Sequence, residues 1–344
     1  MSGGSSVALT VGAPLRVQPV PSLVTPSSTP PPSRPSPNRR LGIAAIVISA
    51  TAMGAAGLFG RMATPPGAAL GEALTLGRML VGALGMMLLI VFSRRLGAIR
   101  RTRLSPSIVL GGVFLGLSLA TYLSSTLLTD LSRAVVLHYL GPLIATVLAR
   151  VLLKESITRL DALSLVTAFA GMLLAAGLIG GAPPAGSDHE TLGTVLGVAS
   201  GLFYGLALLC YRYRSDMPAD VRSFWNFTFG AVATAAMVVV TRPDMTGMTA
   251  TNWAWAAGFF VVCGLLALGL LVIAGKHLRA AELSGLSYLE VVVALILGAL
   301  AFGESISLLA TLGAGMIIAA MTLPLATGRR RRRKIPAAQV GSAA

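Results

Sequence analysis

Long runs of apolar residues, separated by short polar stretches, fill the chain from Leu41 onward. Several runs reach 18 residues or more, and roughly 20 apolar residues span the hydrocarbon core of a bilayer. A backbone exposed to lipid must satisfy its own hydrogen bonds, so each run predicts a membrane helix. We expect ten helices, at residues 41–60, 72–93, 106–126, 132–152, 160–180, 192–211, 223–241, 252–275, 281–302 and 306–326.

The composition supports a membrane protein. Hydrophobic residues make up 55% of the 344 residues, charged residues make up 11%, and the mean hydropathy is +0.80. A soluble domain carries about 25% charged residues, so this chain has too little polar surface for water. The net charge of +15 does not indicate nucleic-acid binding, because the basic residues flank apolar runs and no aromatic stacking platform lies among them. The fold class we predict is an all-α polytopic membrane protein in a lipid bilayer.

The sequence offers no pattern for a cofactor, a metal ion or an enzyme active site. Both cysteines, Cys210 and Cys263, lie inside apolar runs, where they are most simply small core residues. The three histidines are scattered, and none belongs to a cluster with metal-ligand spacing. Glycine-rich nucleotide motifs and a nucleophile-elbow motif are also missing from the sequence. An intramembrane enzyme would need a nucleophile and a base at one depth, which we do not expect here.

The distribution of Lys and Arg predicts the orientation. With the N-terminus in the cytoplasm, 23 of the 27 basic residues fall inside and only Arg61, Arg133 and Arg242 fall outside. This split follows the positive-inside rule, so we predict a plasma-membrane protein with both termini cytoplasmic. Residues 1–40 are rich in Pro and Ser and are predicted to be a disordered tail. Residues 327–344 form a basic cytoplasmic tail.

Two Glu-Ser-Ile motifs reveal an internal repeat. Glu155 and Glu304 are 149 residues apart, and the same shift lays His138–Ile157 over Ser287–Ile306 with seven identities in 20 positions. Five helices in each half, an odd number, make the two halves inverted repeats, at 41–185 and 190–326. Inverted repeats are typical of secondary transporters, whose substrate site lies near the midplane. The two repeated glutamates themselves are expected in helix-end and interfacial roles.

The stretch "SRAVVLHYLGPLIATVLARVLLKES" resembles the signature of EamA-type carriers in the drug/metabolite transporter superfamily. The resemblance covers about residues 41–326. The stretch "LSYLEVVVALILGALAFGES" resembles the threonine/homoserine exporter branch, except that Val291 stands where that branch carries proline. The resemblance implies ten helices, cytoplasmic termini and movement of small metabolites, commonly outward.

Glu290 is the leading candidate for a functional residue. It lies nine residues into the predicted helix 281–302, about 14 Å deep at 1.5 Å per residue. A carboxylate at such a depth is costly unless it is paired, hydrated or protonated. We expect Glu290 to contact the substrate or to take up a coupling proton. A structural hydrogen bond between helices is the alternative.

His138 occupies the corresponding helix of the first half. Its neighbour Gly141 is the repeat partner of Glu290, so the His138 face and the Ser287 face are both predicted to look toward the shared axis. Pro142 lacks an N–H and frees the carbonyl of His138. The alternative for His138 is a packed, hydrogen-bonded core histidine.

Tyr139 and Tyr288 stand out among the tyrosines because the repeat pairs them. Arg78 lies within the second predicted helix and resembles an arginine often found there in the family. It could pair with an acidic substrate or with Glu72, or it could bind a helix end.

The predicted function is therefore transport of a small polar metabolite, such as an amino acid, by alternating access. A drug or organic-cation exporter of the same fold is one alternative, and a non-transporting membrane scaffold is another. The sequence leaves the substrate, the direction, the coupling ion and the oligomeric state open.

Overall fold

The computed structural model describes residues 38–154, 159–175, 179, 188–213, 217–278, 286–287, 289–304 and 306–333. Every regular element in these ranges is a helix, and all of them fall in one unit, Pro37–Ala344. The predicted tail up to residue 37 lies outside the described residues, as do Glu155, Tyr288 and residues 334–344.

The elements follow the apolar runs of the sequence closely. The first half contains α1 (Arg39–Gly54), α2 (Ala56–Ala63), α3 (Gly71–Phe92), α4 (Leu96–Arg100), α5 (Pro106–Leu128), α6 (Leu131–His138), α7 (Leu140–Leu152) and α8 (Arg159–Ala175). The second half contains α9 (Asp188–Tyr213), α10 (Ala219–Thr241), α11 (Ala250–Phe259), the π-helical segment η1 (Phe260–Leu266), α12 (Ala267–His277), α14 (Leu289–Phe302) and α15 (Leu308–Arg333).

Seven helical stretches in the described residues are long and apolar enough to cross a membrane. They are Arg39–Ala63, Gly71–Phe92, Pro106–Leu128, Leu131–Leu152, His189–Tyr211, Ala219–Thr241 and Ala250–Gly275. Three shorter apolar helices, Ala162–Ala175, Leu289–Phe302 and Leu308–Ala320, coincide with the remaining predicted segments. A helical, polytopic membrane protein is thus confirmed, whereas the count of ten spans stays a prediction. The last helix runs to Arg333, beyond the predicted end at 326.

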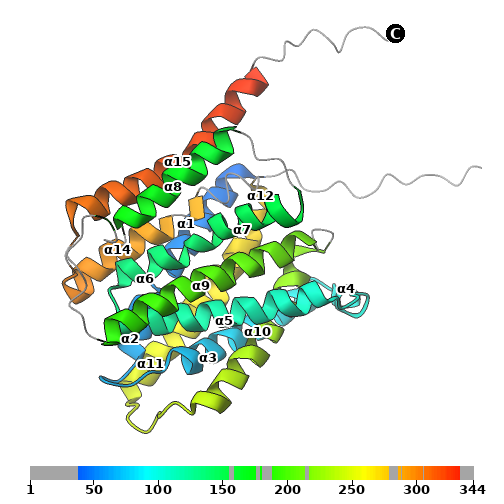
Figure 1. Cartoon of the computed structure of the whole chain (residues 1–344). Coiled ribbons are helices and arrows are strands. Elements are labelled where there is room, and N and C mark those ends of the chain that lie inside the picture. The colour runs from blue at the N-terminus through cyan, green and yellow to red at the C-terminus, as the bar shows by residue number, and fades with distance from the viewer. Residues whose placement is uncertain are drawn as a thin grey trace, which may run out of the picture. The chain divides into compact units, whose positions relative to one another are not determined.

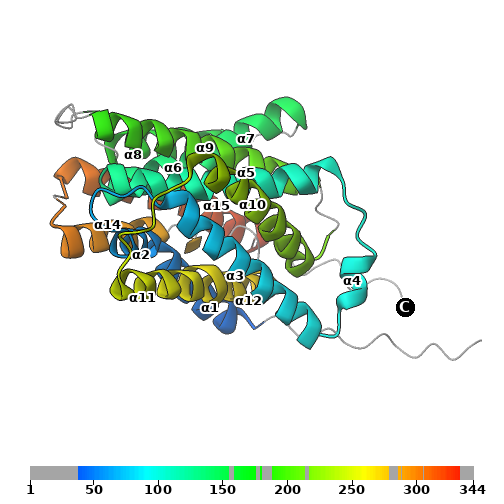
Figure 2. The ribbon, with the colours of Figure 1, turned by 90° about the horizontal axis from the view of Figure 1, so that it is seen from below.

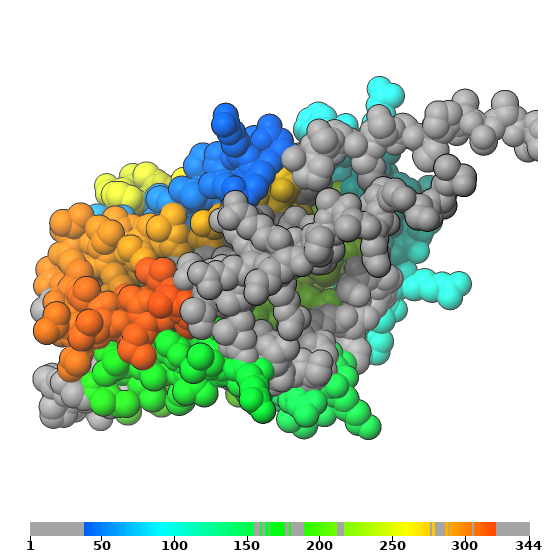
Figure 3. All heavy atoms as spheres, turned by 90° about the horizontal axis from the view of Figure 1, so that it is seen from above, coloured from blue at the N-terminus to red at the C-terminus, as the bar shows by residue number. Residues whose placement is uncertain are grey.

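Glycines allow the helices to approach closely. Helices α3, α5 and α10 contact one another, and α8 pairs with α15 (Figures 1 and 2). In the second pair Gly171 and Gly313 face each other, and a Cβ on Gly313 would lie 2.4 Å from the carbonyl oxygen of Gly171. Figure 3 shows the same pairing on one face, where orange residues of α14 and α15 lie next to green residues. A side chain larger than hydrogen would push these backbones apart.

Large apolar side chains remain exposed around the unit. Val240 is 82% exposed, Phe92 82% and Leu300 79%, while side chains such as Met79, Ile90 and Val135 are fully buried. Membrane helices turn apolar groups toward lipid as well as toward one another, so this distribution fits a protein embedded in a bilayer.

Candidate functional site

Two of the membrane-spanning helices are interrupted near their middle. The stretch Arg39–Ala63 breaks at Ala55, where ψ is −3°, and the stretch Leu131–Leu152 breaks at Tyr139, where ψ is 2°. An α-helix has ψ near −42°, so each value ends one regular half-helix and begins another. Each break is a kink of a single residue, since the Ala55 N–H still donates to the Thr51 carbonyl oxygen and the Tyr139 N–H to that of Val135.

A third irregularity lies in a helix that contacts α1 and α3. The stretch Ala250–Gly275 contains the π-helical segment η1, in which the backbone is wider than in an α-helix. Its Gly264 faces α3, since a Cβ there would lie 3.1 Å from the carbonyl oxygen of Arg78. Phe259, just before η1, lies beneath the Arg78 guanidinium at 5.4 Å. Short π-helical segments are frequent at functional sites.

Glu290 lies in the first turn of α14 and meets the break at Tyr139. The Tyr139 hydroxyl donates a hydrogen bond of 2.6 Å to Glu290 Oε2, and Glu290 is 9% exposed. The same hydroxyl lies 3.5 Å from the carbonyl oxygen of Ser287, so this residue reaches Tyr139 through its backbone. The helical stretch predicted before it, residues 281–289, is described only at 286–287, which are helical, and at Leu289, where α14 begins. A carboxylate in the first turn is stabilised by the helix dipole.

The end of α1 packs directly on this part of α14. Gly54 is the last residue of α1, and a Cβ there would lie 2.7 Å from both the Glu290 carbonyl oxygen and Val293 Cβ. The absence of a side chain at Gly54 therefore lets the broken helix touch the backbone that carries Glu290. Met53, the preceding residue, points its sulfur toward Arg78 at 2.9 Å from Nη2.

Arg78 is buried without a carboxylate partner. It is 2% exposed, and its contacts are the Met53 sulfur and the face of Phe259. Within the described residues no acidic side chain forms an ion pair with it, so the expected alternative of a pair with Glu72 is wrong. Its Nε also has no hydrogen-bond partner there. Burying a guanidinium in this condition costs free energy, because its charge leaves water without a full set of bonds.

Tyr122 of α5 lies near both the basic and the acidic group of the site. Its hydroxyl is buried and, in the part of the chain that the structure covers, has no hydrogen-bond partner. Both Arg78 and Glu290 lie within electrostatic reach of this hydroxyl. The site thus brings together two unsatisfied donors, on Arg78 and Tyr122, and one carboxylate.

His138, the last residue of α6, joins a second polar contact beside Tyr139. Its Nδ1 lies 2.6 Å from Ser200 Oγ, and this hydroxyl also lies 2.9 Å from the carbonyl oxygen of Ser118. Because a carbonyl cannot donate, both contacts are satisfied when the serine hydroxyl donates to Ser118 and the His138 Nδ1–H donates to the serine. A neutral imidazole then keeps Nε2 as an acceptor.

The His138 ring is packed between tyrosines. Its centroid is 4.7 Å from Tyr204 at an interplanar angle of 13°, and 4.7 Å from Tyr122 at 35°. Tyr139 meets it edge-on at 5.8 Å and 88°. His138 is 5% exposed and lies at the border of the site. Its surroundings are those of a packed, hydrogen-bonded core histidine, which was the alternative to a residue that lines the cavity.

Pro142 and Gly141 lie in the first turn of α7, directly after the break. The first four N–H groups of a helix have no partner within the helix, so the missing N–H of Pro142 costs nothing there. Gly141 gives room to Tyr204, whose ring would lie 2.5 Å from a Cβ at this position. Pro142 and Gly141 shape the break at Tyr139. Whether they touch a substrate stays a prediction.

The structure adds residues that the sequence did not single out as site residues. Ser118 and Ser200 exchange hydrogen bonds of 2.9 Å between hydroxyl and carbonyl in both directions, which ties α5 to α9. Tyr122 and Tyr204 lie in apolar segments of the sequence, where nothing distinguishes them from other tyrosines of the helices. Serines in the middle of two apolar segments were the one available signal, since such hydroxyls commonly bond across helices.

Comparisons with known proteins agree with this architecture. The model of the EamA-like transporter family matches the chain twice, at residues 40–177 and 191–325. An uncharacterised transporter of Archaeoglobus fulgidus is 27% identical over 286 residues, which cover 83% of this chain and 96% of that protein. A solved crystal structure of a protein has a TM-score of 0.61 and 18% identity, and covers 85% of this chain and 98% of that one. At that identity the structural likeness concerns the fold alone.

Proposed function

Because the chain belongs to the EamA-like transporter family, we propose that it moves a small polar metabolite across the plasma membrane by alternating access. The expected metabolite is an amino acid or a related compound, and the expected direction is export. The observation that carries the proposal is the unpaired Arg78 beside the Glu290–Tyr139 contact.

Two inverted repeats would supply the alternating movement. The family model matches each half of the chain separately. This double match supports a common plan for the halves, on which the site would lie between them near the midplane.

A solute that carries both a carboxylate and an ammonium group would satisfy the polar groups of the site. The carboxylate would accept from the buried donors on Arg78 and Tyr122, and the ammonium group would pair with Glu290. The Tyr139 hydroxyl would continue to orient the glutamate. An organic cation would use Glu290 and leave Arg78 without a partner, which makes the cation exporter the weaker proposal.

Counterflow tests the proposal directly. Purified protein in liposomes loaded with an unlabelled solute should accumulate the labelled form, and a panel of zwitterionic, cationic and anionic metabolites identifies the class. Glu290→Gln should abolish the exchange of zwitterions. Exchange of cations alone would favour the drug-exporter alternative, and no exchange across the panel would favour the scaffold.

A further inference from the structure

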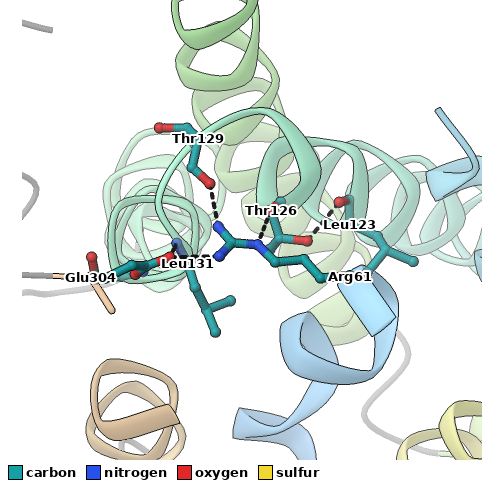
Figure 4. Close-up of polar contacts among 7 residues, drawn as sticks. Arg61, Leu123, Thr126, Thr129, Leu131 and Glu304 are labelled. Atoms are coloured by element: carbon teal, nitrogen blue, oxygen red, sulfur yellow. Dashed lines mark hydrogen bonds and ion pairs between the residues drawn. The ribbon is translucent and has the colours of Figure 1, made fainter. Parts of the chain in front are cut away.

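At one end of the helix bundle a single arginine joins three chain segments. Arg61, in the last turn of α2, donates from Nε to the carbonyl oxygen of Thr126 and from Nη2 to that of Thr129, each at 2.6 Å (Figure 4). Its Nη1 donates to Glu304 Oε1 at 2.7 Å. The guanidinium also lies 4.4 Å from the centre of the Phe302 ring. The carbonyl groups at the end of α5 lack hydrogen-bond donors within the helix, and Arg61 supplies the donors.

The carboxylate of Glu304 that pairs with Arg61 also binds the start of another helix. Its Oε1 accepts from the backbone N–H of Leu131 at 2.7 Å, and its Oε2 accepts from that of Ser132 at 3.3 Å. These two N–H groups belong to the first turn of α6, where backbone donors are unpaired and the helix dipole is positive. The side chains of Arg61 and Glu304 are only 18% and 9% exposed. Little water is therefore available to replace the bonds.

The helices α6 and α14 are fastened at both ends. Glu304 follows the end of α14 and binds the beginning of α6, while Glu290 at the beginning of α14 binds Tyr139 just after the end of α6. The two helices also contact each other. A movement at one fastening therefore changes the geometry at the other.

We propose that Arg61 and Glu304 form a latch that holds this end of the bundle closed and positions Glu290 in the site. Opening at this end requires both residues to leave the helix ends that they bind. The proposal rests on the proposed transport function, because opening and closing at this end would serve alternating access. Arg61 and Glu304 are positioning residues, because they act on the substrate through α6 and α14.

Accessibility of a buried position measures the latch without any substrate. Ala134, three residues beyond Leu131 in α6, is completely buried. In a background in which Cys210 and Cys263 are replaced by alanine, an Ala134→Cys variant is placed in lipid nanodiscs and treated with a polar maleimide. Nanodiscs expose both faces, so the outcome does not depend on orientation. Glu304→Gln should raise the labelling rate about tenfold, as expected for loss of one charge-assisted pair.

A matched control removes a carboxylate near the same end without touching the latch. Asp244 is fully exposed in the loop before α11, and it bonds only to Thr246 among the described contacts. This loop neighbours the end of α2, because Asn252 of α11 donates to the carbonyl oxygen of Met62 at 3.1 Å. Asp244→Asn should leave the labelling rate unchanged. Equal labelling of the Glu304→Gln and Asp244→Asn proteins would overturn the latch.

Exchanging the two charges distinguishes the latch from a simple ion pair. In the double variant Arg61→Glu, Glu304→Arg the charges still attract, but a glutamate cannot donate to the Thr126 and Thr129 carbonyls. The new arginine cannot accept from Leu131 either. Labelling should stay high in this variant, and restoration to the parental rate would contradict the proposal. A thermal melt of each purified variant shows that it is folded.

Transport by the same variants separates this proposal from the proposed function. Glu304→Gln should lower the maximal rate of counterflow at least threefold while KM changes less than twofold, because the groups at the site remain. Changed labelling in a protein that exchanges no solute would uphold the latch and refute the transporter. Unchanged labelling in a protein that does exchange solute would refute the latch and uphold the transport function.

Discussion

Replacing Arg78 by methionine should stabilise the protein and abolish transport at the same time. A buried ion without a partner costs several kcal/mol, and an unsatisfied buried N–H costs about 1–3 kcal/mol. Against this stand the contact with the Phe259 ring at 5.4 Å, worth about 2 kcal/mol, one bond to the Met53 sulfur and the longer-range attraction to the Glu290 carboxylate. The long methionine side chain keeps most of the packing. The net expectation for Arg78→Met is a gain of about 1–3 kcal/mol.

Thermal unfolding in detergent measures this difference. For a chain of this length the gain corresponds to a rise in Tm of about 2–6 °C. The neighbouring variant Met79→Ala is the control, because Met79 is also completely buried and its truncation leaves a cavity that costs about 2–5 kcal/mol. A transported solute at 100 times its Kd should stabilise the parent by about 2.7 kcal/mol and should not stabilise Arg78→Met.

The reasoning fails if Arg78→Met lowers Tm as much as Met79→Ala does. That result would mean that the guanidinium stabilises the fold through contacts of its own and is not waiting for an anionic partner. It would also fail if Arg78→Met retained counterflow at the parental rate, because the site would then work without its buried cation.

Two further changes test the close packing at the site and the charge at the latch end. Gly54→Val should lower stability by about 1–3 kcal/mol in a thermal melt, since its Cβ would lie 2.7 Å from the Glu290 carbonyl oxygen, whereas Gly269→Val, with nothing within 4 Å, should not. Asp130 is partly removed from water, although one side of it stays exposed, and this partial burial raises its pKa above 3.8. The negative charge of the nearby Glu304 carboxylate is the second cause of the raised pKa. The folded protein therefore loses stability as the pH rises from about 3.8 through the raised pKa, so Asp130→Asn should raise Tm at pH 7 and leave it unchanged near pH 3. A Tm gain that persists at low pH would refute this assignment.

The sequence predicted where the helices lie and which of them carry polar groups, because both follow from composition. Runs of apolar residues fix the spans, and a carboxylate in such a run must find a partner, which led to Glu290. The repeat placed the His138 face and the Ser287 face near the same axis, and in the structure the Tyr139 hydroxyl contacts both the Ser287 carbonyl oxygen and Glu290. Whether these residues bind a substrate stays a prediction, and Tyr288 lies outside the described residues.

The break at Ala55 and the latch could not be predicted, because they depend on contacts distant in sequence. The break at Tyr139 has a local signal, since Pro142 cannot donate to the carbonyl of His138. Alanine favours a helix, so the packing around Ala55 decides the other break. Arg61 and Glu304 are 243 residues apart, and their pairing also needs the ends of α5 and α6. From the sequence Arg61 was only one basic residue on the outer side. Local patterns carry no information on such pairs.

The break at Ala55 has a consequence for the resting state of the protein. Under the proposed pairing of the halves, α9 is the counterpart of α1 and α2, yet it runs without interruption from Asp188 to Tyr213. Two identical halves could exchange roles and would give two end states of equal free energy. Halves that differ by one hinge cannot exchange roles, so their two end states differ in free energy. A free-energy difference of about 1.4 kcal/mol already biases the two populations tenfold. The protein would then favour one orientation of its site even in the absence of any solute gradient.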